Sequence, residues 1–201
     1  MELRLKPITR IEGHLEVTIN YDESSKEVKD VKVSAYGFRG FEKILIGRPI
    51  EEVPLITPRI CGVCPVAHHI ASVKAVDQVL NVEVPEYAKL LREILCLSGV
   101  AQIHLLHIVF MVLPDVFKVP GGFVDLVRSN IKLVKKGVEV RSKAQYITEV
   151  SGGRHVHPFN AVPGGVARTL SAEDLEMIRK ASEEGLKGIK SLYEDVIDKF
   201  Y

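Results

Sequence analysis

Two of the chain's three cysteines stand three residues apart, directly before a predicted helix. Cys61 and Cys64 form a C-x-x-C pair, and His68 follows the second cysteine by four residues. Pro65 occupies the position where a helix tolerates proline best, and apolar residues then recur at helical spacing, which predicts a helix over about residues 65–80. A helix N-terminus favours a thiolate over a thiol. One turn along the helix, His68 can donate a hydrogen bond to the Cys64 sulfur, whereas the next histidine points away and is expected to pack internally.

Three kinds of chemistry use such a pair. A structural zinc site needs four ligands, and the chain has no second C-x-x-C pair; Cys96 lies within an apolar segment and is expected to be buried and inert. A thioredoxin-like dithiol would follow a buried strand, which Pro54 and Pro58 disfavour. The third reading is two thiolates that form half of a metal centre. Spacing alone gives these readings comparable weight.

Four motifs, in order along the chain, resemble those of nickel–iron hydrogenase large subunits. The cysteine motif fits that family's R-x-C-G-x-C-x-x-x-H pattern. The matching segments are Pro7 to His14, Phe38 to Glu42 with Gly47 to Pro49, Pro58 to Cys64 with His68, and Ser151 to Pro158 with Gly164 to Val166. Within the family the chain looks most similar to the soluble archaeal hydrogenases of the methyl-viologen- and coenzyme-F420-linked kind.

The resemblance implies roles for the matching residues around the cysteines. Cys61 would be a terminal nickel ligand, and Cys64 would bridge nickel and iron, the iron carrying diatomic ligands. His68 would donate to a cysteine sulfur. The permanent charge of Arg59 beside two thiolates would stabilise them. The centre itself would carry the chemistry, the heterolytic splitting of dihydrogen.

Two carboxylates outside the cysteine motif also match positions of the family. Glu12 matches the residue that passes protons between a nickel-bound cysteine and the surface. Glu42 matches a carboxylate near a magnesium or other divalent ion. Composition alone would make both of them ordinary surface residues.

The chain departs from the family in lacking the second cysteine motif, which members carry near their C-terminus. Cys96 cannot replace a pair. We therefore expect the N-terminal half of a large subunit, whose partners are the missing C-terminal half (from another chain or a truncated remainder), an iron–sulfur small subunit, and an electron-acceptor subunit. We expect this chain alone to be inactive. The alternatives are a non-catalytic structural or coupling subunit related to those of respiratory complex I, and a free dithiol oxidoreductase. The first of these normally lacks the cysteines.

Charge and apolar patterning limit the setting in which the chain works. Lysine and arginine number 27 against 26 acidic residues, so no bulk charge attracts nucleic acid. Three cysteines do not make a disulfide scaffold, which suits a reducing cytoplasm, and the N-terminus shows no secretory signal. Residues 94–114 carry no charge and are long enough to span a membrane, but their polar interruptions favour a core helix buried on most sides.

The remaining patterns predict a mainly helical α+β fold. Alternating apolar residues on either side of Asp22 to Lys26 predict a β-hairpin over about 14–36. Further helices are expected at about 86–113, 122–149 and 172–199, the last opening with a capping box at Ser171. The Gly/Pro-rich segment 151–170 is expected to be a loop. We assign residues 1–201 to one domain, with the hairpin and motif segment in 1–60 and a helical bundle in 61–201.

Overall fold

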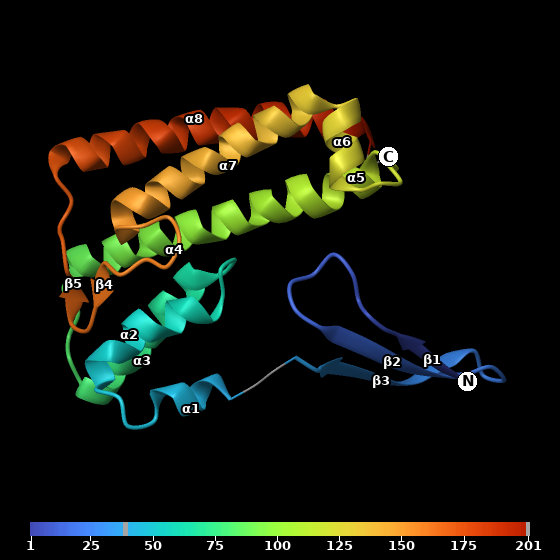
Figure 1. Cartoon of the computed structure of the whole chain (residues 1–201), viewed down its shortest axis with the longest axis horizontal. Helices are drawn as coiled ribbons and strands as arrows, with labels where there is room; N and C mark the ends of the chain where they lie inside the picture. The colour runs from blue at the N-terminus through green and yellow to red at the C-terminus, as the bar shows by residue number, and fades with distance from the viewer. Residues whose placement is uncertain (38–39, 200–201) are drawn as a thin grey trace. The chain divides into compact units, whose positions relative to one another are not determined.

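The computed structural model describes residues 1–37 and 40–199. Its contacts divide the chain into two compact units, Met1–Lys43 and Ile44–Tyr201 (Figure 1). The first holds a small antiparallel sheet and the second is helical, which confirms the mainly helical α+β fold. The assignment of 1–201 to a single domain stays a prediction. Phe38 and Arg39, two residues of the second motif, lie outside the described residues.

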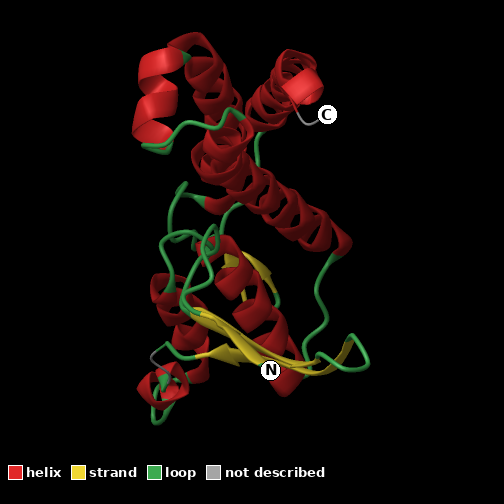
Figure 2. Ribbon diagram, turned by 90° about the vertical axis from the view of Figure 1, so that its right-hand side faces the viewer, coloured by secondary structure: helices red, strands yellow, loops and turns green. Residues whose placement is uncertain are grey.

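The N-terminal unit is a three-stranded antiparallel sheet in the order β1-β2-β3. Its strands are among those drawn in yellow in Figure 2. Its strands are β1 (Glu2–Leu5), β2 (Leu15–Asp22) and β3 (Glu27–Ala35). The predicted hairpin is confirmed, and its turn is closed by the Asp22 carboxylate, which accepts a hydrogen bond from the backbone N–H of Ser24 at 2.9 Å. Strand β1 was not predicted, since four residues are too few to show an alternating pattern.

Charged side chains on one face of this sheet converge on Glu16. Its carboxylate accepts a hydrogen bond from Arg4 and lies 3.0 Å from the ammonium of Lys6. These bonds, Arg4 first and Lys6 second, hold the pKa of Glu16 below its usual value. The cluster joins β2 to β1 and to the residue that follows β1.

Short helical turns fill the segment that leads to the cysteine motif. They are α1 (Phe41–Leu45), a 3-10 turn (Ile50–Glu52), α2 (Val53–Ile56) and a second 3-10 turn (Thr57–Ile60). Thr57 is helical although a proline follows it, and a following proline usually disfavours helical backbone. A 3-10 turn that ends three residues after Thr57 accommodates the ring, because Pro58 then occupies a first-turn position.

The long helices follow the predicted pattern with one exception. The expected single helix at 122–149 is wrong: Asn130, at φ −144°, separates two helices. The predicted capping box is present, since the hydroxyl of Ser171 accepts from the N–H of Asp174 and the carboxylate of Asp174 accepts from the N–H of Ser171. The elements are α3 (Pro65–Leu80), α4 (Glu86–His107), a π-helical turn (Ile108–Val112), α5 (Leu113–Val116), α6 (Phe123–Ser129), α7 (Ile131–Gly152), α8 (Ala172–Val196) and a 3-10 turn (Ile197–Lys199).

Helix α4 runs on through the π turn into α5. Pro114 lacks an N–H to donate to the carbonyl of Phe110, and in regular α geometry its ring would clash there. The turn immediately before Pro114 widens into a π turn, which relieves that clash. A change of hydrogen bonding at one proline thus lets the chain stay helical from Glu86 to Val116.

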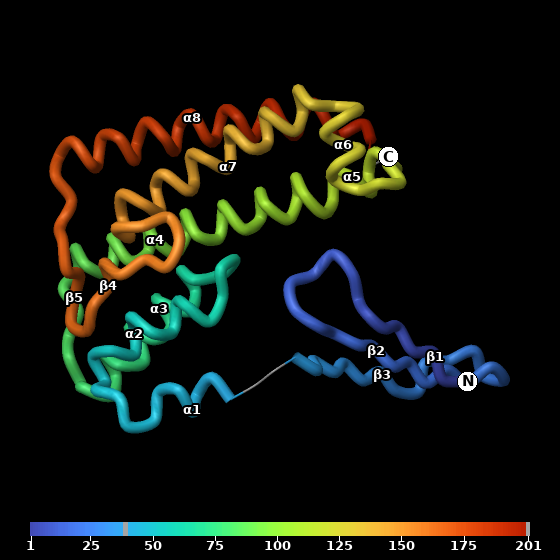
Figure 3. Tube along the Cα trace, in the orientation of Figure 1, coloured from blue at the N-terminus to red at the C-terminus, as the bar shows by residue number. Residues whose placement is uncertain are grey.

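In the helical unit, α4, α7 and α8 lie side by side, and α3 packs against α4 (Figures 1 and 3). The largest apolar cluster joins α4 and α5 to α6, α7 and α8. A second cluster joins α3 to α4, with Val66 and Leu95 at its centre. This second cluster holds the helix that begins at the cysteine motif.

The helix Glu86–Val116 is long and apolar enough to cross a membrane, by length and composition alone. Only 33% of its most apolar window is buried, so the expectation of a helix buried on most sides is wrong for these 201 residues. Apolar side chains of α4 and α8 remain exposed, among them Leu97 at 60% and Leu186 at 55%. The absence of a membrane span stays a prediction.

A close approach between α3 and α4 requires glycine at position 99. A Cβ added to Gly99 would lie 2.8 Å from the side chain of Val66, two residues after Cys64. We expect Gly99→Ala to lower the free energy of unfolding by about 1–3 kcal/mol, because the buried Val66 cannot move away. Gly185→Ala is the matched control: its Cβ would meet Lys143 at an ordinary 3.6 Å, and alanine favours a helix. Urea unfolding of both variants checks this, and equal effects would contradict the close-packing argument.

Candidate metal centre

The cysteine motif places three ligand atoms together at the start of α3. One ligand atom each from Cys61, Cys64 and His68 lies within 4.8 Å of the others, and all three residues are half-buried. Cys64 is the N-cap residue and Pro65 the first helical residue, as predicted. Two thiolates and an imidazole form a soft donor set that suits a late transition metal such as nickel. The residues present therefore fit such a metal.

The backbone of the motif loop is folded around the Cys61 sulfur. The N–H groups of Val63 and Cys64 point to Cys61 Sγ, with nitrogen–sulfur distances of 3.4 and 3.2 Å. Hydrogen bonds from N–H groups favour a charged sulfur over a neutral one. Two backbone N–H groups of the loop therefore face the sulfur of Cys61.

A hydroxyl network ties the turn before the motif to α3. Thr57 is buried, and its hydroxyl lies within hydrogen-bond distance of the hydroxyl of Ser72 (2.9 Å) and the carbonyl of Val53 (3.1 Å). Ser72 in turn donates to the carbonyl of His69 at 2.8 Å. The segments on both sides of Cys61 and Cys64 are thereby held to each other.

His69, adjacent to the candidate ligand His68, is fully buried, and joins three segments. Its Nδ1 lies 2.9 Å from the carbonyl oxygen of Pro54 in α2, and its Nε2 lies 3.2 Å from the backbone nitrogen of Ala161. A carbonyl only accepts and an amide N–H only donates, so the ring must be neutral with its proton on Nδ1. Burial, reinforced by the charge of Arg92, lowers the pKa of His69, which agrees with the neutral form. The prediction that this histidine packs internally is confirmed.

A buried ion pair fixes the far end of α3. Arg92 of α4 lies 2.5 Å from the carboxylate of Asp77, and both side chains are less than 10% exposed. The same guanidinium donates to the carbonyls of Val162 and Gly165, and Asp77 accepts from the N–H of Gly164 at 2.7 Å. These carbonyls belong to a hairpin of β4 (Ala161–Val162) and β5 (Gly165–Val166), an ordered element within the segment predicted to be a loop.

Arg59 and Cys96, which belong to the helical unit, lie outside the ligand cluster. Arg59 is exposed, and its guanidinium donates to the carbonyl of Leu55. Cys96 is half-buried and packs against the apolar cluster between α3 and α4. Glu12 and Glu42 are exposed residues of the N-terminal unit. The roles assigned to Glu12, Glu42 and Arg59 stay predictions.

Sequence reasoning missed the partners of His69 and of Arg92. Arg92 stands in an apolar helix, and a lone charge at such a position is the one available signal that it is paired. Its acceptors are 15 to 73 residues away along the chain, so no local pattern could identify them.

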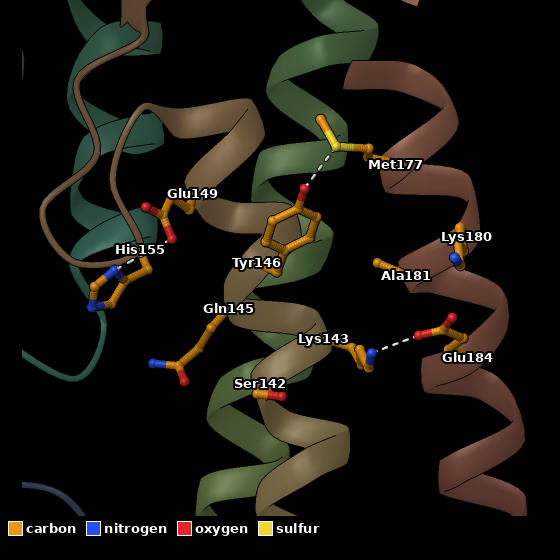
Figure 4. A pocket seen from close by; sticks show the side chains of 10 residues that line it. All are labelled: Ser142, Lys143, Gln145, Tyr146, Glu149, His155, Met177, Lys180, Ala181 and Glu184. Carbon is orange, nitrogen blue, oxygen red and sulfur yellow. Dashed lines mark hydrogen bonds and ion pairs between the residues drawn. The ribbon is translucent and has the colours of Figure 1, made fainter. Parts of the chain in front are cut away.

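A wide hollow of about 760 Å³ lies elsewhere in the helical unit, between α7 and α8 (Figure 4). Its polar side chains mostly contact one another: Lys143 pairs with Glu184 at 2.5 Å, and the Tyr146 hydroxyl lies 3.0 Å from Met177 Sδ. The hollow is wide and open to solvent, and among its charged side chains Lys143 pairs with Glu184 and Glu149 with His155. Its size therefore does not make it the site of chemistry.

Comparison with known proteins places this arrangement in a family. A family model described as nickel-dependent hydrogenase matches residues 39–117, and a HoxL-like model matches residues 2–36. The F420-non-reducing hydrogenase vhu of Methanocaldococcus jannaschii has a subunit that is 38% identical over 98% of this chain and 52% of that protein. The alpha subunit of sulfhydrogenase 2 of Pyrococcus furiosus is 36% identical over 93% of this chain and 45% of that protein.

Solved structures agree with the sequence matches. The Ni-Fe-Se hydrogenase of D. vulgaris Hildenborough superimposes with a TM-score of 0.81 at 28% identity, over 98% of this chain and 44% of that one. An NAD+-reducing NiFe-hydrogenase superimposes with a TM-score of 0.73 at 31% identity, over 96% and 46%. The chain belongs to the nickel-dependent hydrogenase family, whose large subunits it matches. It spans about half the length of the curated relatives.

Two substitutions of His69 should each remove one of its two hydrogen bonds. Asparagine retains a donor near Nδ1 for Pro54, and glutamine retains an acceptor near Nε2 for Ala161. We expect each variant to lose about 1–3 kcal/mol of unfolding free energy, the cost of leaving one buried partner unsatisfied. We also expect faster alkylation of Cys61 and Cys64, because the motif loop loses one of its supports.

The matched control is Thr148→Val, which removes the buried 2.9 Å hydrogen bond between Ser98 of α4 and Thr148 of α7. It should reduce stability by a similar amount without changing the rate of alkylation. If the control accelerates alkylation as much as the His69 variants do, His69 has no specific role at the motif.

Proposed function

We propose that these 201 residues form the nickel-ligating N-terminal half of a hydrogenase large subunit, in an enzyme that oxidises dihydrogen reversibly. The observation that carries the proposal is the Cys61, Cys64 and His68 cluster at the N-terminus of α3, with ligand atoms within 4.8 Å. Family membership supports the choice of metal. The retained cysteines argue against a structural relative without nickel.

Two of the cluster's residues would hold the metals and the third would act beside them. The thiolates of Cys61 and Cys64 would ligate a nickel–iron centre, which supplies the splitting of dihydrogen when bound. His68 would orient or polarise a cysteine sulfur from one turn along the helix. The N–H groups that point to Cys61 Sγ would hold this sulfur in place.

The other thiolates and the electron path would come from further protein. The chain has three cysteines, and Cys96 packs in the α3–α4 interface, so no second pair is available among these residues. A polypeptide with a second C-x-x-C pair would complete the centre, and an iron–sulfur subunit would carry electrons to an acceptor subunit. The exposed apolar side chains of α4 and α8 give such a polypeptide surface to cover. We place the assembled enzyme in the cytoplasm, among archaeal-type soluble hydrogenases.

Metal binding tests the half-centre directly. We expect the isolated 201-residue chain to bind Ni²⁺ or Co²⁺ weakly and exchangeably, with thiolate-to-metal absorption, because half of the ligands are absent. Cys61→Ser and Cys64→Ser should each abolish that absorption, whereas Cys96→Ser, the matched control, should not. The isolated chain should show no dihydrogen-dependent dye reduction. Stoichiometric, tightly held nickel together with turnover from the isolated chain would refute the proposal.

Proton transfer is the role proposed for Glu12. In the assembled enzyme, Glu12→Gln should leave the nickel and iron content unchanged and slow dihydrogen/deuterium exchange by about 10²–10⁴-fold, since an amide cannot relay a proton. The control is Glu23→Gln, a change at another exposed carboxylate of the N-terminal unit. Unchanged exchange would remove Glu12 from the pathway, and loss of metal would make its role structural.

A further inference from the structure

A second, much smaller cavity of about 50 Å³ lies behind the cysteine motif. One wall is the loop between the two cysteines, at Gly62 and Val63. The other walls are α4, α7 and the start of the loop after α7. The cavity is more enclosed than the large hollow, and its polar lining consists of Gln102, Arg141, Gln145 and His155.

Arg141 is the unusual member of this lining. Its Nη1 donates to the amide oxygen of Gln145 at 3.2 Å, but its Nε is buried and has no hydrogen-bond partner among the described residues. Burial also lowers the pKa of Arg141. A guanidinium has five N–H donors and stays charged, so a buried nitrogen without an acceptor is a cost that a bound anion would remove.

The described part of the chain supplies no carboxylate for this arginine within 4.0 Å. The nearest acidic residue after it on α7 is Glu149, eight residues and therefore about 12 Å along the axis. Glu149 lies 3.8 Å from His155 Nδ1 instead (Figure 4). The exposed arginine of α8, Arg179, shows the contrast, because it pairs with both Glu176 and Glu183 at 2.6 Å.

We propose that this cavity binds a carboxylate group, held by the Nε and Nη2 edge of Arg141. Among the described residues Gln145 contacts Nη1 and leaves that edge without a partner. Its two parallel N–H donors match the two oxygens of a carboxylate. Each water-sized atom needs about 10–15 Å³, so 50 Å³ accepts about three to five atoms, as in formate or the end of an aspartate side chain. The carboxylate would link α7 to the loop that carries the cysteines. This inference goes beyond the proposed function and does not depend on it.

The carboxylate has two sources, a small free anion or an acidic side chain of another polypeptide. Formate is the probe for the first. In the purified, metal-free protein with uniform ¹⁵N labelling, the Nε–H resonance of Arg141 and the amide resonances of Gly62 and Val63 are followed during titration with sodium formate. Sodium chloride at equal ionic strength is the reference. Arg141→Lys identifies the Nε–H resonance and keeps the charge while removing the two-nitrogen edge.

A saturable shift with a dissociation constant on the order of 1 mM, near the limit for a three-atom ligand, supports a free-anion site. Arg141→Lys should weaken it about tenfold or more, judged by the Gly62 and Val63 amides. Arg128→Lys should leave it unchanged, because Arg128 is 77% exposed and lies near Asp125. The titration of the unsubstituted protein decides the question even if Arg141→Lys unfolds.

Occupation by a protein carboxylate gives a different result in the protein purified with its partners. The Arg141 Nε–H is then protected from solvent exchange and insensitive to formate, and Arg141→Met lowers the recovery of the partner about tenfold. The proposal is overturned if Nε–H exchanges as fast as that of Arg128 and ignores formate. It is equally overturned if Nε–H is protected and insensitive to formate while Arg141→Met leaves partner recovery unchanged, since a water molecule then satisfies the nitrogen.

Discussion

The position of α3 depends on two buried contacts, one near each end. Near its start, His69 connects α2 to the β4–β5 hairpin, and near its end Asp77 pairs with Arg92. Both contacts end on backbone groups of the same hairpin. Loss of one partner typically costs about 3–5 kcal/mol for a buried ion pair and about 1–3 kcal/mol for a buried hydrogen bond, so neither end is easily displaced. The helix that follows the cysteine loop is therefore held in position by contacts with other parts of the helical unit.

Local patterns predicted the elements that local forces determine. The helix after Pro65, the capping box at Ser171 and the β2–β3 hairpin each depend on residues within a few positions of one another. The same holds for the Cys61, Cys64 and His68 cluster, because one loop and one helical turn bring these residues together. Sequence reasoning failed where distant contacts decide. The two-residue strands β4 and β5 depend on Arg92 from α4, and the break at Asn130 separates two helices that pattern alone joins.

The exposure of apolar side chains on α4 is the other feature that could not be predicted from the sequence. The uncharged segment of α4 was expected to be buried on most sides, because its composition is that of a core helix. In these 201 residues it is covered mainly on the faces toward α3 and α7. A composition pattern reports how a helix is covered in the complete protein, not which polypeptide covers it. This chain spans about half the length of its relatives, so apolar side chains that the composition suggests are covered can be exposed in it.

The cysteine motif likewise combines contacts made within these residues with groups that have no partner among them. Its first sulfur receives two backbone N–H groups, and the helix that follows it is anchored near both ends. What the motif lacks is opposite charge and further ligands: Arg59 donates to a backbone carbonyl, and the Nε of Arg141 has no partner among the described residues. The positive groups need carboxylates, and the thiolates need a metal with further ligands. Under the function proposed above, one polypeptide that brings both acidic and sulfur-bearing residues would supply both, so that assembly and completion of the centre would be a single event.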